Sequence, residues 1–255
     1  FSSRPFMGRW FGRFRRLPWW GRGLILLAAL AGIAGGGLAA LVLYSYTQTN
    51  SGPAIRRWFD DRASRAGLMT VRREPCPGAP FLLPTDGFIG LLWRDPTGPY
   101  NIFRRHPGVD IFGDGEPGAI PVRAAYDGYL TRLPDWVASV IIRHDDPLQP
   151  GRVIWTYYTH MASQDGESFV AEAFPPGTSE VWVEQGTVLG YQGNYSGSSL
   201  APTGLHLHFS VVKSEPDGSF KNEGRLGNTL DPSPYLGMTL NSDARPLRPI
   251  DCAAG

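Results

Sequence analysis

The sequence has few of the residues that build covalent frameworks or metal clusters. It holds two cysteines among 255 residues, too few for a disulfide scaffold or a thiolate metal cluster. No Walker loop, dinucleotide fingerprint or internal repeat occurs, and no segment after residue 70 has the pattern of a long helix. With 42% hydrophobic residues, 32 glycines and 23 prolines, the composition excludes a coiled coil and a disordered chain. It is typical of a turn-rich globular protein.

Acidic residues are scarce in the first 75 positions. That part holds twelve arginines and three acidic residues, a net charge of +9, whereas residues 76–255 carry −8 and the whole chain +1. A basic arm joined to an acidic globular part indicates that the two face different partners. The acidic part lacks the basic face that phosphate neutralisation requires, so we expect no nucleic-acid partner.

No charged side chain occurs between Leu24 and Tyr44. As a helix, this run is about 31 Å long, enough to cross a hydrocarbon core of about 30 Å. Six arginines and no acidic residue precede it, which places residues 1–23 in the cytoplasm and the chain after Tyr46 outside. A cleaved signal peptide is the alternative, but the run exceeds the ~7–15 residues of a signal core and no A-x-A-like site follows. We predict a single-pass membrane helix over residues 24–46, contacting the lipid bilayer.

Small residues recur every four positions within this run, at Ala28, Gly32, Gly36 and Ala40. They lie on one helix face, where small side chains let a second membrane helix approach closely. The alternative is that glycine and alanine are simply common in membrane helices. A membrane-protein partner on this face is therefore one prediction of the sequence.

Residues 47–75 predict a juxtamembrane helix and linker. Ser51-Gly52-Pro53 is a helix-start signal and Gly67 a stop signal. Ile55, Trp58 and Phe59 share a face, which predicts contact either with the membrane surface or a partner, or with the chain's own domain.

From residue 76 to 240, short β-branched or alternating runs are separated by turn residues. This pattern predicts an all-β domain, a small open antiparallel sheet or barrel-like sandwich, followed by a tail over residues 241–255. Examples of such strand-like runs are Val137–Arg143, Val153–Tyr158, Val181–Glu184, Val188–Tyr191 and Leu205–Val212. Outside the cytoplasm Cys76 and Cys252 would either pair, at a gain of roughly 5 kcal/mol in the chain-entropy model, or remain buried thiols.

Four of the five histidines form a pattern. His206 and His208 are two apart in an apolar strand, so both imidazoles leave one face while Leu207 leaves the other. His106 and Asp110 are four apart around a glycine and can point to one side of an extended segment. Two imidazoles and a carboxylate would leave a tetrahedral zinc one open position, as in a catalytic site. The fourth histidine, His160, follows a predicted strand, and the fifth, His144, ends another strand outside the pattern and is interpreted as structural.

The segment from about Asn101 to Tyr235, half of the chain, resembles the lysostaphin-type (LytM-like) zinc peptidases that cut bacterial cell-wall peptides. The resemblance runs through HPGVDIFG, IPVRAAYDGYL, YYTHM, VEQGTVLGYQGNYSGSS, GLHLHFSV and LDPSPYL. It implies the family's small open antiparallel β-fold with a groove across the metal. It also implies Zn²⁺ ligands His106, Asp110 and His208 and catalytic imidazoles His160 and His206. The loops Ala162–Ser179 and Leu200–Thr203 are longer than a minimal member needs, and we expect both to border the groove.

Three functions follow from these patterns. The first is a bacterial membrane-anchored zinc endopeptidase acting on peptidoglycan peptide stems or cross-bridges, with its C-terminal domain in the periplasm or at the cell surface. The second is an accessory or structural subunit of a membrane complex that retains the peptidase fold, held by the small-residue face and by Ile55, Trp58 and Phe59. A regulator of other hydrolases fits less well, because the sequence has no coiled coil and all five motif positions are filled.

Overall fold

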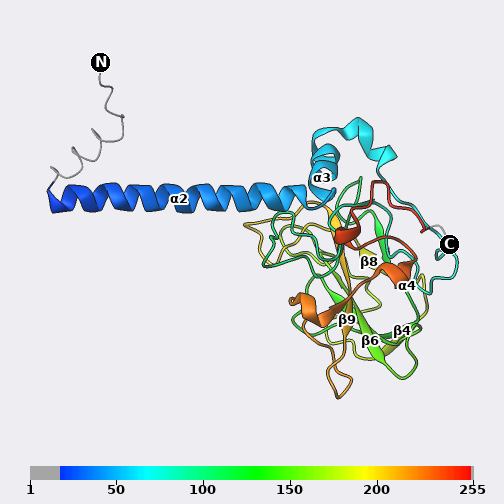
Figure 1. Ribbon diagram of the computed structural model, residues 1–255. Coiled ribbons are helices and arrows are strands. Elements are labelled where there is room, and N and C mark those ends of the chain that lie inside the picture. Colours follow the sequence, from blue (N-terminus) through cyan, green and yellow to red (C-terminus); the bar gives the residue numbers. More distant parts are fainter. Residues whose placement is uncertain (1–17, 254–255) are drawn as a thin grey trace. The chain divides into compact units, whose positions relative to one another are not determined.

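The computed structural model describes residues 18–253 and divides the chain into two compact units, Phe1–Ser45 and Tyr46–Gly255. The first unit holds most of helix α2 (Trp19–Thr47), drawn in Figure 1 as one unbroken helix. Its span Trp19–Tyr44 has a mean hydropathy of 2.3, and its side chains are not buried against protein. The predicted apolar helix is confirmed as a helix long and apolar enough to cross a membrane, and it begins five residues earlier than expected.

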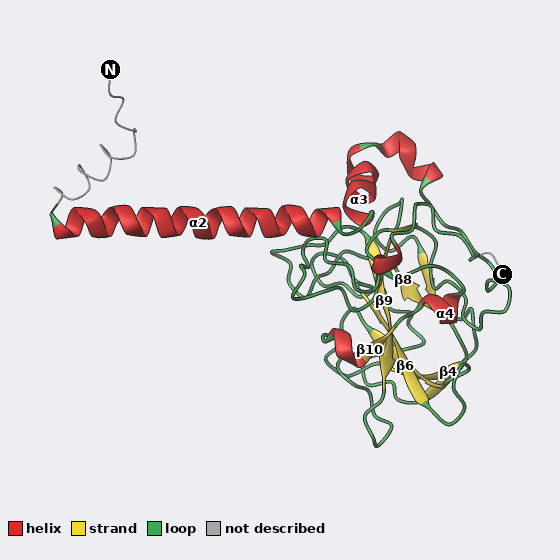
Figure 2. Cartoon of the chain, viewed as in Figure 1, coloured by secondary structure: helices red, strands yellow, loops and turns green. Residues whose placement is uncertain are grey.

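The second unit is mainly antiparallel β-sheet, as predicted (Figure 2). Its larger sheet has the strand order β1-β2-β9-β6-β5-β4-β7, with β10 also paired to β9, and β3 and β8 form a second sheet. The strands are β1 (Phe88–Ile89), β2 (Val109–Phe112), β3 (Pro121–Arg123), β4 (Gly128–Thr131), β5 (Val140–Asp145), β6 (Val153–Thr159), β7 (Val181–Val183), β8 (Val188–Tyr191), β9 (His206–Lys213) and β10 (Thr229–Leu230).

Helices are short in this unit. After residue 70, the described chain contains one α-helix, α4 (Ser233–Leu236), and two 3₁₀ turns, Leu226–Asn228 and Ser242–Ala244. The main core lies on one face of the central strands, where Leu207 and Phe209 of β9 are fully buried. The opposite face of β9 is therefore free to carry polar side chains.

The juxtamembrane segment packs on its own domain. Helix α3 (Ser51–Asp60) ends earlier than predicted, because Asp61 adopts an extended conformation, and residues Arg62–Gly67 continue as a 3₁₀ helix. The Trp58 side chain is 2% exposed and stacks on Phe88 with 5.1 Å between ring centroids. Phe59 remains about half exposed. Of the two alternatives for this face, packing on the domain holds for Trp58, which is not available to a partner.

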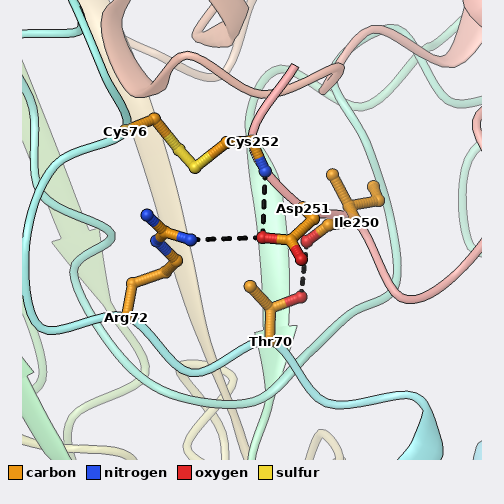
Figure 3. Close-up of a disulfide and its surroundings, with 6 residues drawn as sticks. All are labelled: Thr70, Arg72, Cys76, Ile250, Asp251 and Cys252. Atoms are coloured by element: carbon orange, nitrogen blue, oxygen red, sulfur yellow. Dashed lines mark hydrogen bonds and ion pairs between the residues drawn. A yellow bond between two sulfur atoms is a disulfide. The ribbon is translucent and has the colours of Figure 1, made fainter. Parts of the chain in front are cut away.

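Cys76 and Cys252 form a disulfide that joins the start of the domain to the C-terminal tail (Figure 3). The hydroxyl of Thr70 donates a hydrogen bond to the Ile250 carbonyl at 2.7 Å, and Arg72 pairs with Asp251 at 3.2 Å. The tail is thus attached to the domain by covalent and polar contacts. This resolves the question of pairing that the sequence left open.

Candidate metal centre

Strand pairing brings Asp110 and His208 together. The register of β2 against β9 sets Asp110 opposite His208, and Asp110 Oδ1 lies 2.8 Å from His208 Nδ1. His206, two residues earlier on β9, leaves the same face, and its Nε2 lies 3.8 Å from Asp110 Oδ1. The predicted alternation along this strand is confirmed, since the intervening Leu207 belongs to the core.

His106 reaches the same point from the loop before β2. Its Nδ1 is 3.0 Å from the carbonyl of Leu92, to which it donates, so Nε2 keeps its lone pair. That Nε2 lies 3.0 Å from His208 Nδ1 and 3.1 Å from Asp110 Oδ1. A side chain at Gly108 would meet the Phe209 carbonyl at 2.4 Å, so this tight approach of the loop to β9 requires glycine.

The three donor atoms could hold a metal ion. All three residues are buried, and the donor atoms lie 2.8–3.1 Å from one another. Ligands at about 2.0–2.1 Å from a tetrahedral zinc would be about 3.3 Å apart, so an outward shift of a few tenths of an ångström would admit the ion. The structure therefore brings together His106, Asp110 and His208, as the sequence predicted.

A second carboxylate lies behind His208. His208 Nε2 donates to Ser210 Oγ at 2.9 Å and lies 3.5 Å from Glu223 Oε2. Such outer partners fix the orientation of a ligating imidazole. Strand alternation could have indicated Ser210, two residues after His208, but Glu223 comes from a loop and no sequence pattern marks it.

The electrostatics of this cluster favour a bound cation. Burial alone would lower the pKa of His208, but hydrogen bonds to Asp110 and Glu223 outweigh it and raise the pKa to about 10. Burial would likewise raise the pKa of Asp110, yet the imidazoles of His106 and His206 hold it well below its usual value. The pKa of Glu223 is also lowered, by its hydrogen bond to His208 against the effect of burial. The two ionised carboxylates thus hold a proton on His208, at the position where a metal ion would supply the positive charge instead.

The other two histidines of the pattern, His160 and His206, have neutral rings that lie beside each other. The His160 and His206 rings lie 4.4 Å apart between centroids. The Nδ1 of His160 donates to the Tyr195 carbonyl at 2.6 Å, and that of His206 to the Gly204 carbonyl at 2.7 Å, so each Nε2 keeps a lone pair. Burial lowers both pKa values, that of His160 to about 3. His160 also has a left-handed backbone, with φ of 74°, a conformation that costs a non-glycine residue energy and is enriched at functional sites.

A cavity of about 560 Å³ lies beside the cluster. Tyr100 lines this cavity, and the centroid of its ring lies 4.7 Å from that of the His106 ring. Burial and the charges of Asp110 and Glu223 raise the Tyr100 pKa, so its phenol stays protonated. The other lining residues are Arg104, Asp135, Trp136, Val137, Ala138, Ser139, Tyr157, Thr159, His160, Tyr195, Ser196, Gly197, His208 and Glu223.

No residue of the two long loops lines this cavity in the described chain, although Ala201 of the second loop accepts a hydrogen bond from Ser196, which does. Among the residues described, the segment between the two loops lines the cavity, through Tyr195, Ser196 and Gly197. In the first loop, Phe174 is buried in the core, and Arg132 donates hydrogen bonds to the Phe174 carbonyl and the Ser168 hydroxyl.

His144 lies outside the metal cluster. It is 1% exposed, its Nδ1 donates to the Asp127 carbonyl at 2.7 Å, and its Nε2 lies 2.8 Å from Thr156 Oγ1. Both ring nitrogens are thereby satisfied within the protein, in agreement with a structural role.

Comparison with other proteins identifies no family for this chain. A scan against protein-family models finds no match, and a search of curated proteins finds none either.

Proposed function

We propose that this chain is a bacterial membrane-anchored zinc endopeptidase that hydrolyses peptide bonds in peptidoglycan stems or cross-bridges. One observation carries the proposal: a buried His106, Asp110 and His208 cluster adjoins two neutral imidazoles and an open cavity. The antiparallel sheet and the order of the sequence motifs support the resemblance to lysostaphin-type peptidases. The apolar helix α2 supports anchoring in the bilayer.

The donor set of two imidazoles and one carboxylate suits zinc and leaves a fourth position open. A bound zinc would polarise the scissile carbonyl and make a hydroxide nucleophile available near neutral pH. The chain's own residues supply the proton transfers. Because Nδ1 of His160 and of His206 is held by a carbonyl, each ring offers Nε2 as the base that accepts the proton of the attacking water.

The same geometry completes the reaction. The imidazolium formed in this way can then give its proton to the leaving amine. The second imidazole, or the protonated phenol of Tyr100, is available to donate a hydrogen bond to the developing oxyanion. The peptide itself would lie in the 560 Å³ cavity.

The test begins with zinc content of the full chain purified in detergent. We expect about one zinc per chain in the wild type and none in His208→Ala, since that substitution removes one of three ligands. His160→Ala should keep zinc but release no peptides from purified peptidoglycan, measured by mass spectrometry of the soluble products. A wild type that takes up no zinc even after supplementation contradicts the peptidase and favours the accessory-subunit function.

A further inference from the structure

We propose that two loops of the β-domain form a surface that rests on the phospholipid headgroups of the bilayer in which α2 is embedded. The surface consists of Phe103, Arg104, Arg245 and Leu247, and we call it the seating surface. The inference rests on the proposed membrane anchoring but not on the proposed peptidase activity.

Chain connectivity limits how far this surface lies from the membrane. Helix α2 has 29 residues, so it is about 43 Å long, close to the full bilayer thickness of about 40–45 Å including the headgroups. Asn50 follows its last residue, Thr47, by three positions, which is at most about 11 Å of chain. Asn50 Nδ2 donates to the Arg245 carbonyl at 2.6 Å. The Arg245 backbone therefore lies within a short length of chain from the end of α2, close to the headgroup layer.

The second loop is joined to the first at the same place. The Thr49 hydroxyl lies 3.1 Å from that of Thr97, at the start of the loop that carries Phe103 and Arg104. Asp243 then ties the two loops together, because it pairs with Arg105 at 2.9 Å and with Arg94 at 3.0 Å. Both loops thus border the point where the chain leaves the membrane.

The side chains on this surface suit a headgroup layer. Phe103 is 84% exposed and Leu247 is 79% exposed, so each presents an apolar side chain beside an arginine. Arg104 and Arg245 are exposed and have no carboxylate partner among the ion pairs of the described chain. Apolar side chains that insert at the acyl boundary, flanked by cations that reach phosphates, are the combination that binds membrane surfaces.

The seating surface continues into the candidate site, because Arg104 also lines the cavity beside His160 and His208. Contact with the headgroups would hold one rim of this cavity at the membrane. The substrate would then be peptide close to the bilayer rather than distant wall.

The experiment uses the full chain in vesicles of phosphatidylcholine and phosphatidylglycerol. Both native cysteines are in the disulfide, so an introduced cysteine is the one free thiol for a nitroxide label. Test positions are Phe103→Cys and Leu247→Cys. Leu30→Cys, in α2, is the lipid reference, and Leu148→Cys, 44% exposed on the β5–β6 hairpin, is the water reference. Collision rates with oxygen, which enters lipid, and with a water-soluble nickel chelate report each label's surroundings.

We expect labels at positions 103 and 247 to have a several-fold higher oxygen-to-nickel ratio than position 148. Arg104→Gln with Arg245→Gln should move that ratio toward the water reference. Labels at 103 and 247 that behave like position 148, while position 30 reports lipid, would overturn the seating surface and leave anchoring intact. Shielding of both labels from oxygen and nickel alike would mean a protein partner, which also overturns it. A water-exposed label at position 30 would instead refute anchoring itself.

Discussion

Each imidazole of the candidate site is oriented by its second ring nitrogen. His106, His160 and His206 each donate Nδ1–H to a backbone carbonyl, whereas His208 uses its Nε2 for Ser210 and turns Nδ1 toward Asp110. Backbone carbonyls cannot rotate away as side chains can, so the tautomers are set by the fold. The site therefore presents three Nε2 lone pairs without rearrangement, and Nδ1 of His208 becomes a ligand once a metal displaces its proton.

Glu223 is predicted to strengthen metal binding without contacting the metal. Glu223→Gln removes the charge behind His208 Nε2 while keeping the side chain's size, so zinc affinity should fall about 10- to 100-fold. Competition with a fluorescent zinc chelator measures the change. The matched control is Glu215→Gln, whose carboxylate pairs with Lys221 at 3.3 Å on the surface. Equal affinities for the two variants would show that Glu223 does not support the ligand.

His144 makes stability depend on pH. Burial lowers its folded pKa to about 4, against 6.5 when unfolded, so the unfolded chain binds the proton more tightly. The contribution of neutral His144 to the free energy of unfolding is then fully present above pH 6.5. It falls as pH drops toward 4, by up to about 3 kcal/mol. Urea unfolding of His144→Asn should show lower stability at neutral pH but a flatter decline between these pH values. An unchanged decline would assign the acid sensitivity to other groups.

At the residue scale, sequence reasoning found the polar residues whose spacing is tied to a strand. His206 and His208 could be placed on one face because side chains alternate, and Asp110 fell opposite His208 once the strands paired. Tyr100 and Glu223 could not be found in this way, since loops bring them to the cavity. No local periodicity encodes a loop's path.

At the scale of elements, helix α3 packs against a strand that supports the candidate site. The Phe59 ring meets that of Phe112 edge-on at 5.6 Å, and Phe112 stacks on His206 at 5.0 Å. Phe59 also covers Gly204, where an added Cβ would lie 3.0 Å from the ring. Gly204 supplies the carbonyl that orients His206. Phe59 is thus a positioning residue for an imidazole that it does not touch.

Phe59→Ala should therefore lower kcat for peptide release several-fold with KM and zinc content little changed, because the His206 ring loses its support. Its side chain is half exposed, so the loss of stability should be smaller than the ~3–5 kcal/mol expected for a fully buried aromatic such as Trp58. Ile55→Ala on the same helix is the control. If kcat is the same in both variants, α3 has no positioning role.

At the scale of the whole molecule, the sequence located some of the strands but not their assembly. Of the five strands named from the sequence, Val188–Tyr191 matches to the residue and the other four to within three residues, because turn signals bound each run. The short strands β1 to β4 and β10 were not named. Pairing of β3 with β8 in a separate sheet was not predictable, since long-range pairing depends on the packing of both faces. The two alternatives for α3 stayed open for the same reason: an apolar helix face does not reveal what covers it.

The C-terminal tail is predicted to secure both ends of the domain. The disulfide closes a separation of 176 residues, so its loss should cost about 5 kcal/mol in the chain-entropy model. Cys76→Ser with Cys252→Ser should lower the unfolding midpoint accordingly, measured by urea titration. The tail also holds α3, because Arg248 donates to the Ser51 hydroxyl at 3.1 Å and to the Gly90 carbonyl at 2.8 Å.

Removing the disulfide should consequently loosen α3 as well as the tail. Hydrogen exchange of the amides in residues 54–60 should speed up in the double serine variant, while exchange in the central strands β6 and β9 changes only as global stability does. Arg248→Gln, which keeps the disulfide, provides the comparison: it should accelerate exchange in α3 with a smaller loss of global stability. If the amides of α3 exchange at the wild-type rate in both variants, Trp58 alone attaches this helix to the domain. The tail would then link Cys252 to Cys76 without holding α3.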